Sequence, residues 1–288
     1  MLSDHGIRVF STHYNDNIYN GLIRFDGTTD GISSIGAGNN RYDYWSVTER
    51  NNIFYHTDES GMMRYADGNT STGTYSSASA NTATTSVSTA ISVEGDLVAR
   101  WYERSGGPSI IGWYLNGSVF EVNVPDGLSE SSNHHGQIAF GPDGRLHVLM
   151  VNLSATTIGF YHYYADLGSS LSGSSTVEWS SPHLVLERNQ STAWSSGAQH
   201  SATEDHTADL HMSHNGTLYA AMYNQTDLHF STFDGTSWST EMVSSSTGKN
   251  EGVTIATNSS GTAFIAWIDH DVDKLMLCLL YTSPSPRD

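Results

Sequence analysis

Cysteine, lysine and long apolar runs are all scarce in this sequence. The single cysteine, Cys278, excludes a disulfide framework and a site built from several thiolates. No apolar run approaches the roughly 20 residues that a membrane-spanning helix requires, and residues 1–25 lack the basic and then apolar pattern of a signal peptide. We therefore expect a globular chain without a membrane span.

Positive charge is scarce as well. The chain has 12 Lys and Arg residues against 30 Asp and Glu residues, which gives a formal net charge of −18. An acidic surface repels nucleic acid and anionic membranes, so both are excluded as partners. An anionic ligand would need a local basic pocket. Apolar residues make up 37% of the sequence, which supports a real core.

What the sequence does contain is a repeated hairpin. The clearest copy, Asn133–Asn152, has two β-prone runs on either side of the turn Pro142-Asp143-Gly144. The turn glycine recurs at Gly95, Gly216 and Gly261, with weaker copies at Gly6 and Asn52. Most intervals are about 45 to 50 residues. The longer interval after Gly144 is explained by two insertions, one before Trp179 and one within Glu187–Asp205.

A second set of turns lies between these hairpins. Its members are Asp26-Gly27, Asp67-Gly68, Asn116-Gly117, Asp166 and Asp234-Gly235. Each repeat therefore holds four strands as two hairpins, which is typical of a β-propeller blade. We predict an all-β fold, a β-propeller with four-stranded antiparallel blades, of which about five and a half are present out of an expected seven. In this prediction the first blade lacks its first strand and the sixth stops after its second. A β-sandwich is the alternative, because it also spaces its strands regularly.

The C-terminal segment differs in composition from the rest of the chain. Residues 278–288 read CLLYTSPSPRD, which matches one reading frame of a transposase sequencing adapter. We interpret this segment as a non-native tail. Residues 1–277 are then predicted to be a single propeller domain, truncated at both ends, from an environmental (metagenomic) fragment.

Polar and aromatic residues gather where the repeat predicts one face of the propeller. Segments that enter the first strand of each blade and segments that leave the second strand lie on the same face, and loops on such a face carry function. The entering segments contain His134, His135 and His206, and the longer insertion contains Trp194. The leaving segments contain His13, Tyr14, His56, Tyr102, Glu103, Arg104, Asn152, Tyr223, Asn224, Asp269 and His270.

These residue types suit general acid–base chemistry on a sugar polymer. Histidine titrates near neutral pH and can act as a base, a tyrosine can act as the acid, and an arginine can bind a carboxylate. The candidate catalytic residues are His134 or His135 as base, Tyr102, Tyr223 or Tyr14 as acid, and Arg104 for the carboxylate. We expect the other residues of this face to bind substrate, with Trp194 stacking on a sugar ring. Solvation alone also places polar residues at strand ends, and that alternative stays open.

The remaining histidines and the acidic run near the end are expected to be structural. His147, His162, His211, His214 and His229 lie within predicted strands or in the far turns, where packing or solvation is favoured. The alternating acids of Asp269–Asp273 suit calcium, but this run lacks the glycine of a calcium loop, so a solvated turn is favoured. No cofactor is predicted, and a structural calcium ion is the one exception left open.

The segment NHHGQIAFGPDGRLHVLM resembles the signature hairpin of BNR-repeat propellers related to polysaccharide lyases, within the sialidase-like superfamily. The matching residues are His134 or His135, Asp143, Gly144, Leu146 and His147. The resemblance implies a seven-bladed propeller that cleaves uronate-containing polysaccharides by β-elimination. A His or Tyr then removes the C5 proton and a basic residue neutralises the carboxylate. The family commonly has a second His where this chain has Asn152, so only the position of His134 or His135 is transferred.

The sequence therefore favours a secreted or cell-surface polysaccharide lyase that acts on a uronate polymer. Two alternatives stay open: a non-catalytic propeller that binds glycans or mediates viral or cell-surface adhesion, and a sialidase-like glycoside hydrolase. The sialidase box is matched less well, because Ser231–Trp238 is one residue short between Asp234 and Gly235. The expected partner is a polysaccharide or other glycan, and the oligomeric state is not predicted.

Overall fold

The computed structural model describes the chain in segments. These are residues 2–3, 6–13, 17–24, 33–37, 46–50, 53–58, 61–66, 70–76, 85–104, 107–125, 136–152, 159–187, 208–213, 215–224, 227–245, 250–258, 261–269, 272 and 274–280. Within these segments the regular structure is β, and no helix is long and apolar enough to cross a membrane. The chain forms two compact units, one made of Met1–Val124 with Gly168–Thr176, the other of Pro125–Leu167 with Val177–Asp288.

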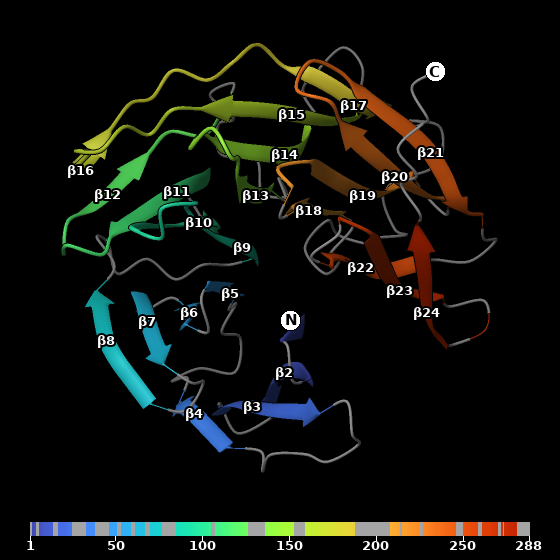
Figure 1. Cartoon of the computed structure of the whole chain (residues 1–288). Helices are drawn as coiled ribbons and strands as arrows, with labels where there is room; N and C mark the ends of the chain where they lie inside the picture. Colours follow the sequence, from blue (N-terminus) through green and yellow to red (C-terminus); the bar gives the residue numbers. More distant parts are fainter. Residues whose placement is uncertain are drawn as a thin grey trace. The chain divides into compact units, whose positions relative to one another are not determined.

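Unit 1 contains three sheets, blades one to three (Figure 1). Blade one is β1 (Leu2–Ser3), β2 (Gly6–His13), β3 (Asn17–Arg24) and β4 (Ser33–Ala37). Blade two is β5 (Ser46–Arg50), β6 (Ile53–Asp58), β7 (Gly61–Ala66) and β8 (Thr70–Ser76). Blade three is β9 (Thr85–Ile91), β10 (Leu97–Arg104), β11 (Gly107–Tyr114) and β12 (Val119–Val122), joined by β16 (Gly173–Ser175).

Unit 2 contains the three other sheets, blades four to six. Blade four is β13 (Gly136–Phe140), β14 (Leu146–Asn152), β15 (Gly159–Ala165) and β17 (His183–Glu187). Blade five is β18 (Ala208–Met212), β19 (Leu218–Asn224), β20 (Asp227–Phe233) and β21 (Trp238–Ser244). Blade six is β22 (Asn250–Thr257), β23 (Ala263–Asp269) and β24 (Lys274–Leu280). The first strands β13, β18 and β22 lie next to one another.

The predicted repeat is confirmed at its turns. Gly95, Gly144, Gly216 and Gly261 all have positive φ angles, between 75° and 83°, a conformation that glycine adopts at no steric cost. At Gly144 the turn closes with two backbone hydrogen bonds, from Gly141 N to Arg145 O at 2.8 Å and from Gly144 N to Gly141 O at 3.0 Å. The alignment of the inner hairpins therefore rests on a shared backbone geometry.

The prediction was wrong about the two ends of the repeat. Blade one does have a first strand, because β1 pairs with β2 through Leu2 and Ser3. Blade six continues past its second strand, because β24 pairs along the whole of β23. The end of β24 includes Cys278–Leu280, which belong to the segment interpreted above as a non-native tail. The origin of residues 278–288 and the single-domain assignment of residues 1–277 stay predictions.

Blade five buries both of its faces. Leu218, Ala220 and Met222 alternate along β19 and pack with blade four residues such as Leu149 and Phe160. The intervening residues of β19, Tyr219, Ala221 and Tyr223, pack with blade six. This explains why β19 is apolar at nearly every position, since a strand buried on both sides has no polar face. Antiparallel four-stranded sheets stacked face to face in this way confirm the predicted β-propeller fold.

The chain leaves blade four between β15 and β17 to complete blade three. Residues 173–175 form β16, which pairs in parallel with Phe120, Glu121 and Val122 of β12. The Tyr114 hydroxyl donates to the carbonyl of Gly168 at 3.0 Å and accepts from the amide of Leu171 at 3.4 Å. The insertion predicted before Trp179 is therefore a fifth strand of blade three that protects the edge of β12.

Candidate functional site

The second strand of each blade ends on a polar residue. The final residues of β2, β6, β10, β14, β19 and β23 are His13, Asp58, Arg104, Asn152, Asn224 and Asp269. In unit 2 these strand ends lie in consecutive blades, and we call Asn152, Tyr223, Asn224 and Asp269 the strand-end edge. Its members are those that the hairpin pattern assigned to the functional face of the propeller.

Tyr223 is the best-defined residue of the strand-end edge. Its side chain is 1% exposed, and its hydroxyl has no hydrogen-bond partner in the described part of the chain. Burial raises the pKa of Tyr223, and the Asp269 carboxylate raises it further because a second negative charge nearby is unfavourable. The phenol is therefore protonated at neutral pH and lies within the electrostatic range of Asp269.

Asn224 and Asp227 form the hairpin end beside Tyr223. They are opposite each other in the register of β19 and β20, and the Ser245 hydroxyl donates to Asp227 at 2.7 Å. His229, further along β20, is half-buried, and burial lowers its pKa while Asp227 acts in the opposite direction. This corner of blade five thus presents an amide, a carboxylate and a neutral imidazole.

The other predicted site residues are placed less completely. His13, His56, Tyr102, Glu103 and Arg104 lie in the strands of unit 1, and Asn152 ends β14 in unit 2. Tyr14, His134, His135, Trp194, His206 and His270 lie outside the described residues. The structure therefore brings together Tyr223, Asn224 and Asp269, and the roles of the remaining candidates stay predictions.

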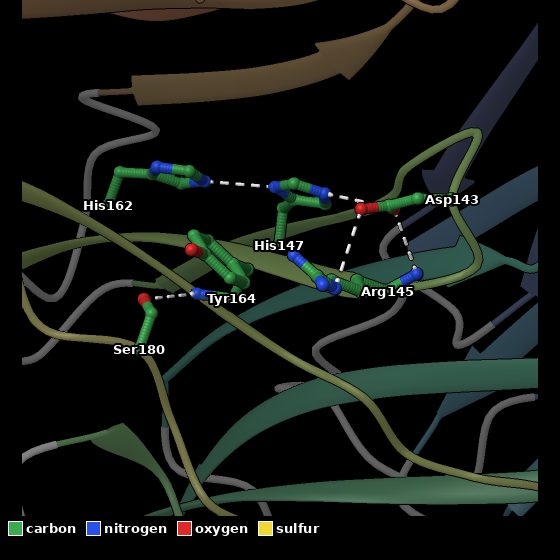
Figure 2. Close-up of polar contacts among 6 residues, drawn as sticks. All are labelled: Asp143, Arg145, His147, His162, Tyr164 and Ser180. Atoms are coloured by element: carbon green, nitrogen blue, oxygen red, sulfur yellow. Dashed lines mark hydrogen bonds and ion pairs between the residues drawn. The ribbon is translucent and has the colours of Figure 1, made fainter. Parts of the chain in front are cut away.

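A second polar cluster lies at the opposite end of β14, beside the Pro142-Asp143-Gly144 turn (Figure 2). His147 Nδ1 and His162 Nε2 are 2.9 Å apart and share one hydrogen bond. The two rings are nearly parallel, at an interplanar angle of 4°. His147 Nε2 lies 3.7 Å from Asp143 Oδ1. The row runs from an exposed carboxylate, through a buried imidazole, to a second imidazole that is 0% exposed.

Aromatic rings surround this row. Tyr164 is tilted against both histidines and stacks with His183 at 24°. The Arg145 guanidinium lies 5.0 Å from the centre of the Tyr164 ring, and its Nε is 3.6 Å from Asp143 Oδ2, as Figure 2 shows. Arg145 therefore contacts both the Asp143 carboxylate and the Tyr164 ring on the exposed side of the cluster.

Burial lowers the pKa of both histidines. Desolvation is the largest cause for His147, and Asp143 opposes it. Desolvation also lowers the pKa of His162 to about 2, with smaller contributions in the same direction from His147 and His183. Both rings are therefore neutral at physiological pH. The described side chains hold no group of three or more His, Cys, Asp or Glu residues placed to bind a metal ion.

The sequence predicts His147 and His162 to be packing residues within strands, and both are buried in strands. The hydrogen bond between them was not predicted. The signal was present in the repeat, because Tyr219 and Phe230 occupy the matching positions of blade five and stack at 5.3 Å. An imidazole pair replaces an aromatic pair at the same register.

No protein-family model and no curated protein matches the chain. Its structure is similar to AofleA from Arthrobotrys oligospora at 7% identity, with a TM-score of 0.57 over 94% of this chain and 71% of that one. It is also similar to hydrazine synthase of Kuenenia stuttgartiensis, at 8% identity with a TM-score of 0.54 over 94% and 72% of the two chains. An ancestral GH74 enzyme aligns at 10% identity with a TM-score of 0.50, over 91% of this chain and only 37% of that one. These likenesses show the fold.

Proposed function

We propose that this protein is a carbohydrate-active β-propeller that binds a glycan at the strand-end edge. The observation that carries the proposal is that the second strands of blades five and six end on half-buried polar residues, Asn224 and Asp269, beside the buried phenol of Tyr223. A sugar hydroxyl both donates and accepts hydrogen bonds, and an amide and a carboxylate at these strand ends complement it. A polymeric glycan as ligand implies a secreted or cell-surface location.

The more specific proposal is a polysaccharide lyase that cleaves a uronate-containing chain by β-elimination. Tyr223 is protonated at neutral pH, as a residue that donates a proton to the leaving oxygen must be. His134 or His135 is the candidate base that removes the C5 proton, and Arg104 is the candidate that neutralises the uronate carboxylate. Tyr102 is the alternative acid.

The test is a panel of uronate polysaccharides, read by the ultraviolet absorbance of the unsaturated product. A lyase gives rising absorbance that the double variant His134→Ala/His135→Ala abolishes. The matched control is Tyr161→Phe in the outer strand β15, which should keep wild-type turnover. A flat trace on every uronate polymer, or full activity in the double variant, contradicts the lyase assignment.

One observation favours a non-catalytic glycan-binding or adhesion propeller instead. The Tyr223 hydroxyl is enclosed, and a general acid must come within hydrogen-bond reach of the substrate. A glycan array that reports binding, combined with no turnover of the bound glycans, would select this function. Glycoside hydrolysis, the activity class of the GH74 enzyme with a similar fold, would instead release new reducing ends without ultraviolet absorbance.

A further inference from the structure

We propose that the His147–His162 pair is an acid-sensitive lock between blades four and five, which holds the two sheets together while both rings are neutral and releases them when the pair takes up a proton. The proposal is independent of the glycan site, because the pair lies at the opposite end of β14 from Asn152. It rests on the contacts of the pair, on the positions of its protons and on the residues that face it.

The first step is the contact across the blades. The His162 ring packs against two rings of blade five, Phe233 at 4.9 Å and 63°, and Trp238 at 5.2 Å and 80°. The surrounding interface contains apolar side chains such as Leu149 and Leu218. A proton taken up by His162 would therefore place a charge against these two rings of blade five.

The second step is the position of the protons. The 2.9 Å contact between His147 Nδ1 and His162 Nε2 contains one hydrogen. The Asp143 carboxylate favours a hydrogen on His147 Nε2, which it faces at 3.7 Å. His162 Nε2–H must then donate to His147 Nδ1, since a neutral imidazole carries one N–H. This leaves a lone pair on His162 Nδ1, which has no partner among the described residues.

The third step is the fate of an added proton. His162 Nδ1 is the one ring nitrogen of the pair with an unused lone pair, so the proton goes there and makes His162 a cation. The ring then becomes a buried charge beside Phe233 and Trp238, whose side chains do not ionise. A buried charge without a counter-ion is strongly destabilising. Opening the interface to water relieves that cost.

The titratable and charged groups around the pair do not compensate for the cation. His183 on β17 and Arg145 in the turn both act against a positive charge. Tyr164 on β15 lies tilted against both rings. Asp143 is separated from His162 by His147. On blade five, Asp234 follows Phe233, but its carboxylate accepts hydrogen bonds from Thr236 and Ser237 within its own turn.

The expected size follows from the shift in proton affinity. Because the pKa of His162 in the folded protein lies below the unfolded value of 6.5, the unfolded chain binds the proton more tightly. Stability is therefore full above about pH 6.5 and falls as the pH drops below it. A histidine with a folded pKa of about 2 raises the unfolding constant about 30-fold between about pH 7.5 and about pH 5.

Blade five supplies the matched variant. His147→Tyr/His162→Phe installs the residues that blade five carries at the same register, Tyr219 and Phe230. In urea unfolding, the rise of the unfolding constant between the two pH values should be at least about 30-fold larger in the wild-type protein than in the double variant. His211→Gln is the control, since His211 bonds to Thr257 outside the cluster, and it should keep the wild-type pH dependence. Equal pH dependence in the wild-type protein and the double variant would overturn the proposal.

A second measurement needs no variant and covers the case in which the double variant does not fold. In ¹⁵N-labelled wild-type protein, long-range imidazole spectra should show Nε2–H tautomers for His147 and His162 at neutral pH. Hydrogen exchange should accelerate on acidification in β15, β20 and β21 before it accelerates in β22 and β23. A His162 ring that is protonated at about pH 6 in the folded state, or exchange that accelerates in all these strands together, would refute the lock.

Discussion

Replacing Tyr223 by Phe removes one oxygen atom from a buried site and leaves the ring in place. The hydroxyl has no hydrogen-bond partner in the described structure, and an unsatisfied buried polar group costs about 1 to 3 kcal/mol. The ring packs in the core between blades five and six, and Phe preserves that packing. We therefore expect Tyr223→Phe to raise the free energy of unfolding at neutral pH, by about 1 kcal/mol or more.

The matched control is Tyr219→Phe in the same strand. The Tyr219 hydroxyl donates to the carbonyl of Gly261 at 3.3 Å, so its removal should lower the free energy of unfolding by about 0.5 to 1.5 kcal/mol. Both variants lose the same hydroxyl group, but urea denaturation should show a higher free energy of unfolding for Tyr223→Phe and a lower one for Tyr219→Phe. A Tyr223→Phe variant that is destabilised as much as Tyr219→Phe would show that the reasoning about the unsatisfied hydroxyl is wrong.

Alkaline pH gives a further test of the same residue. The pKa of Tyr223 is raised above its ordinary value of 10.0, by burial and then by Asp269. In the unfolded chain the phenol ionises near that ordinary value, so Tyr223 should cost stability as the pH rises above about 10. The Phe variant lacks this loss, and its advantage over the wild-type protein should widen at high pH. If Tyr223 is also the acid of a lyase, the more stable variant should lose turnover, which is a common conflict between stability and activity.

Two other predictions concern packing. A Cβ atom at Gly112 would overlap the buried Phe120 ring, whereas Gly117 has open space around it and a φ angle of 108°. Gly112→Ala should therefore cost about 1 to 3 kcal/mol in chemical denaturation, and Gly117→Ala about 1 kcal/mol from backbone strain alone; equal costs would contradict this. Leu275 and Leu277 of β24 are 75% and 71% exposed, so Leu275→Thr/Leu277→Thr should reduce self-association in light scattering, and unchanged association would show that this face is not the cause.

The repeat was predictable because it depends on local chemistry. Tight turns with glycine at positive φ, such as Gly144 and Gly216, have a sequence signature that does not require knowledge of distant contacts. The repeat also extends to the fourth strands, since Val185 and Val243 both lie at a register shift in the fourth strand of their blades. Long-range pairing was harder, and β16 was missed because a short polar strand carries almost no pattern.

The candidate site was likewise predictable from the sequence only in part. The pattern placed Asn224 and Asp269 correctly at the ends of second strands. It did not predict that the Tyr223 hydroxyl would be enclosed, because burial depends on how blades five and six pack. Nor did it predict the His147–His162 bond, which joins residues that are diagonal neighbours across β14 and β15. Such pairs follow only from the register of the sheet.

Because β16 follows β15 in the sequence but pairs with β12, blade three is completed late in synthesis of the chain. Strands β9 to β12 leave the ribosome first, and the partner of β12 follows only after the chain has extended from Val122 to Gly173. Those roughly 50 residues take about 3 to 10 s at ordinary elongation rates. During that interval the outer strand of blade three has an open edge that a neighbouring nascent chain can pair with. We therefore expect slower translation of Asn123–Ser172 to increase misassembly, although the finished protein would be unchanged.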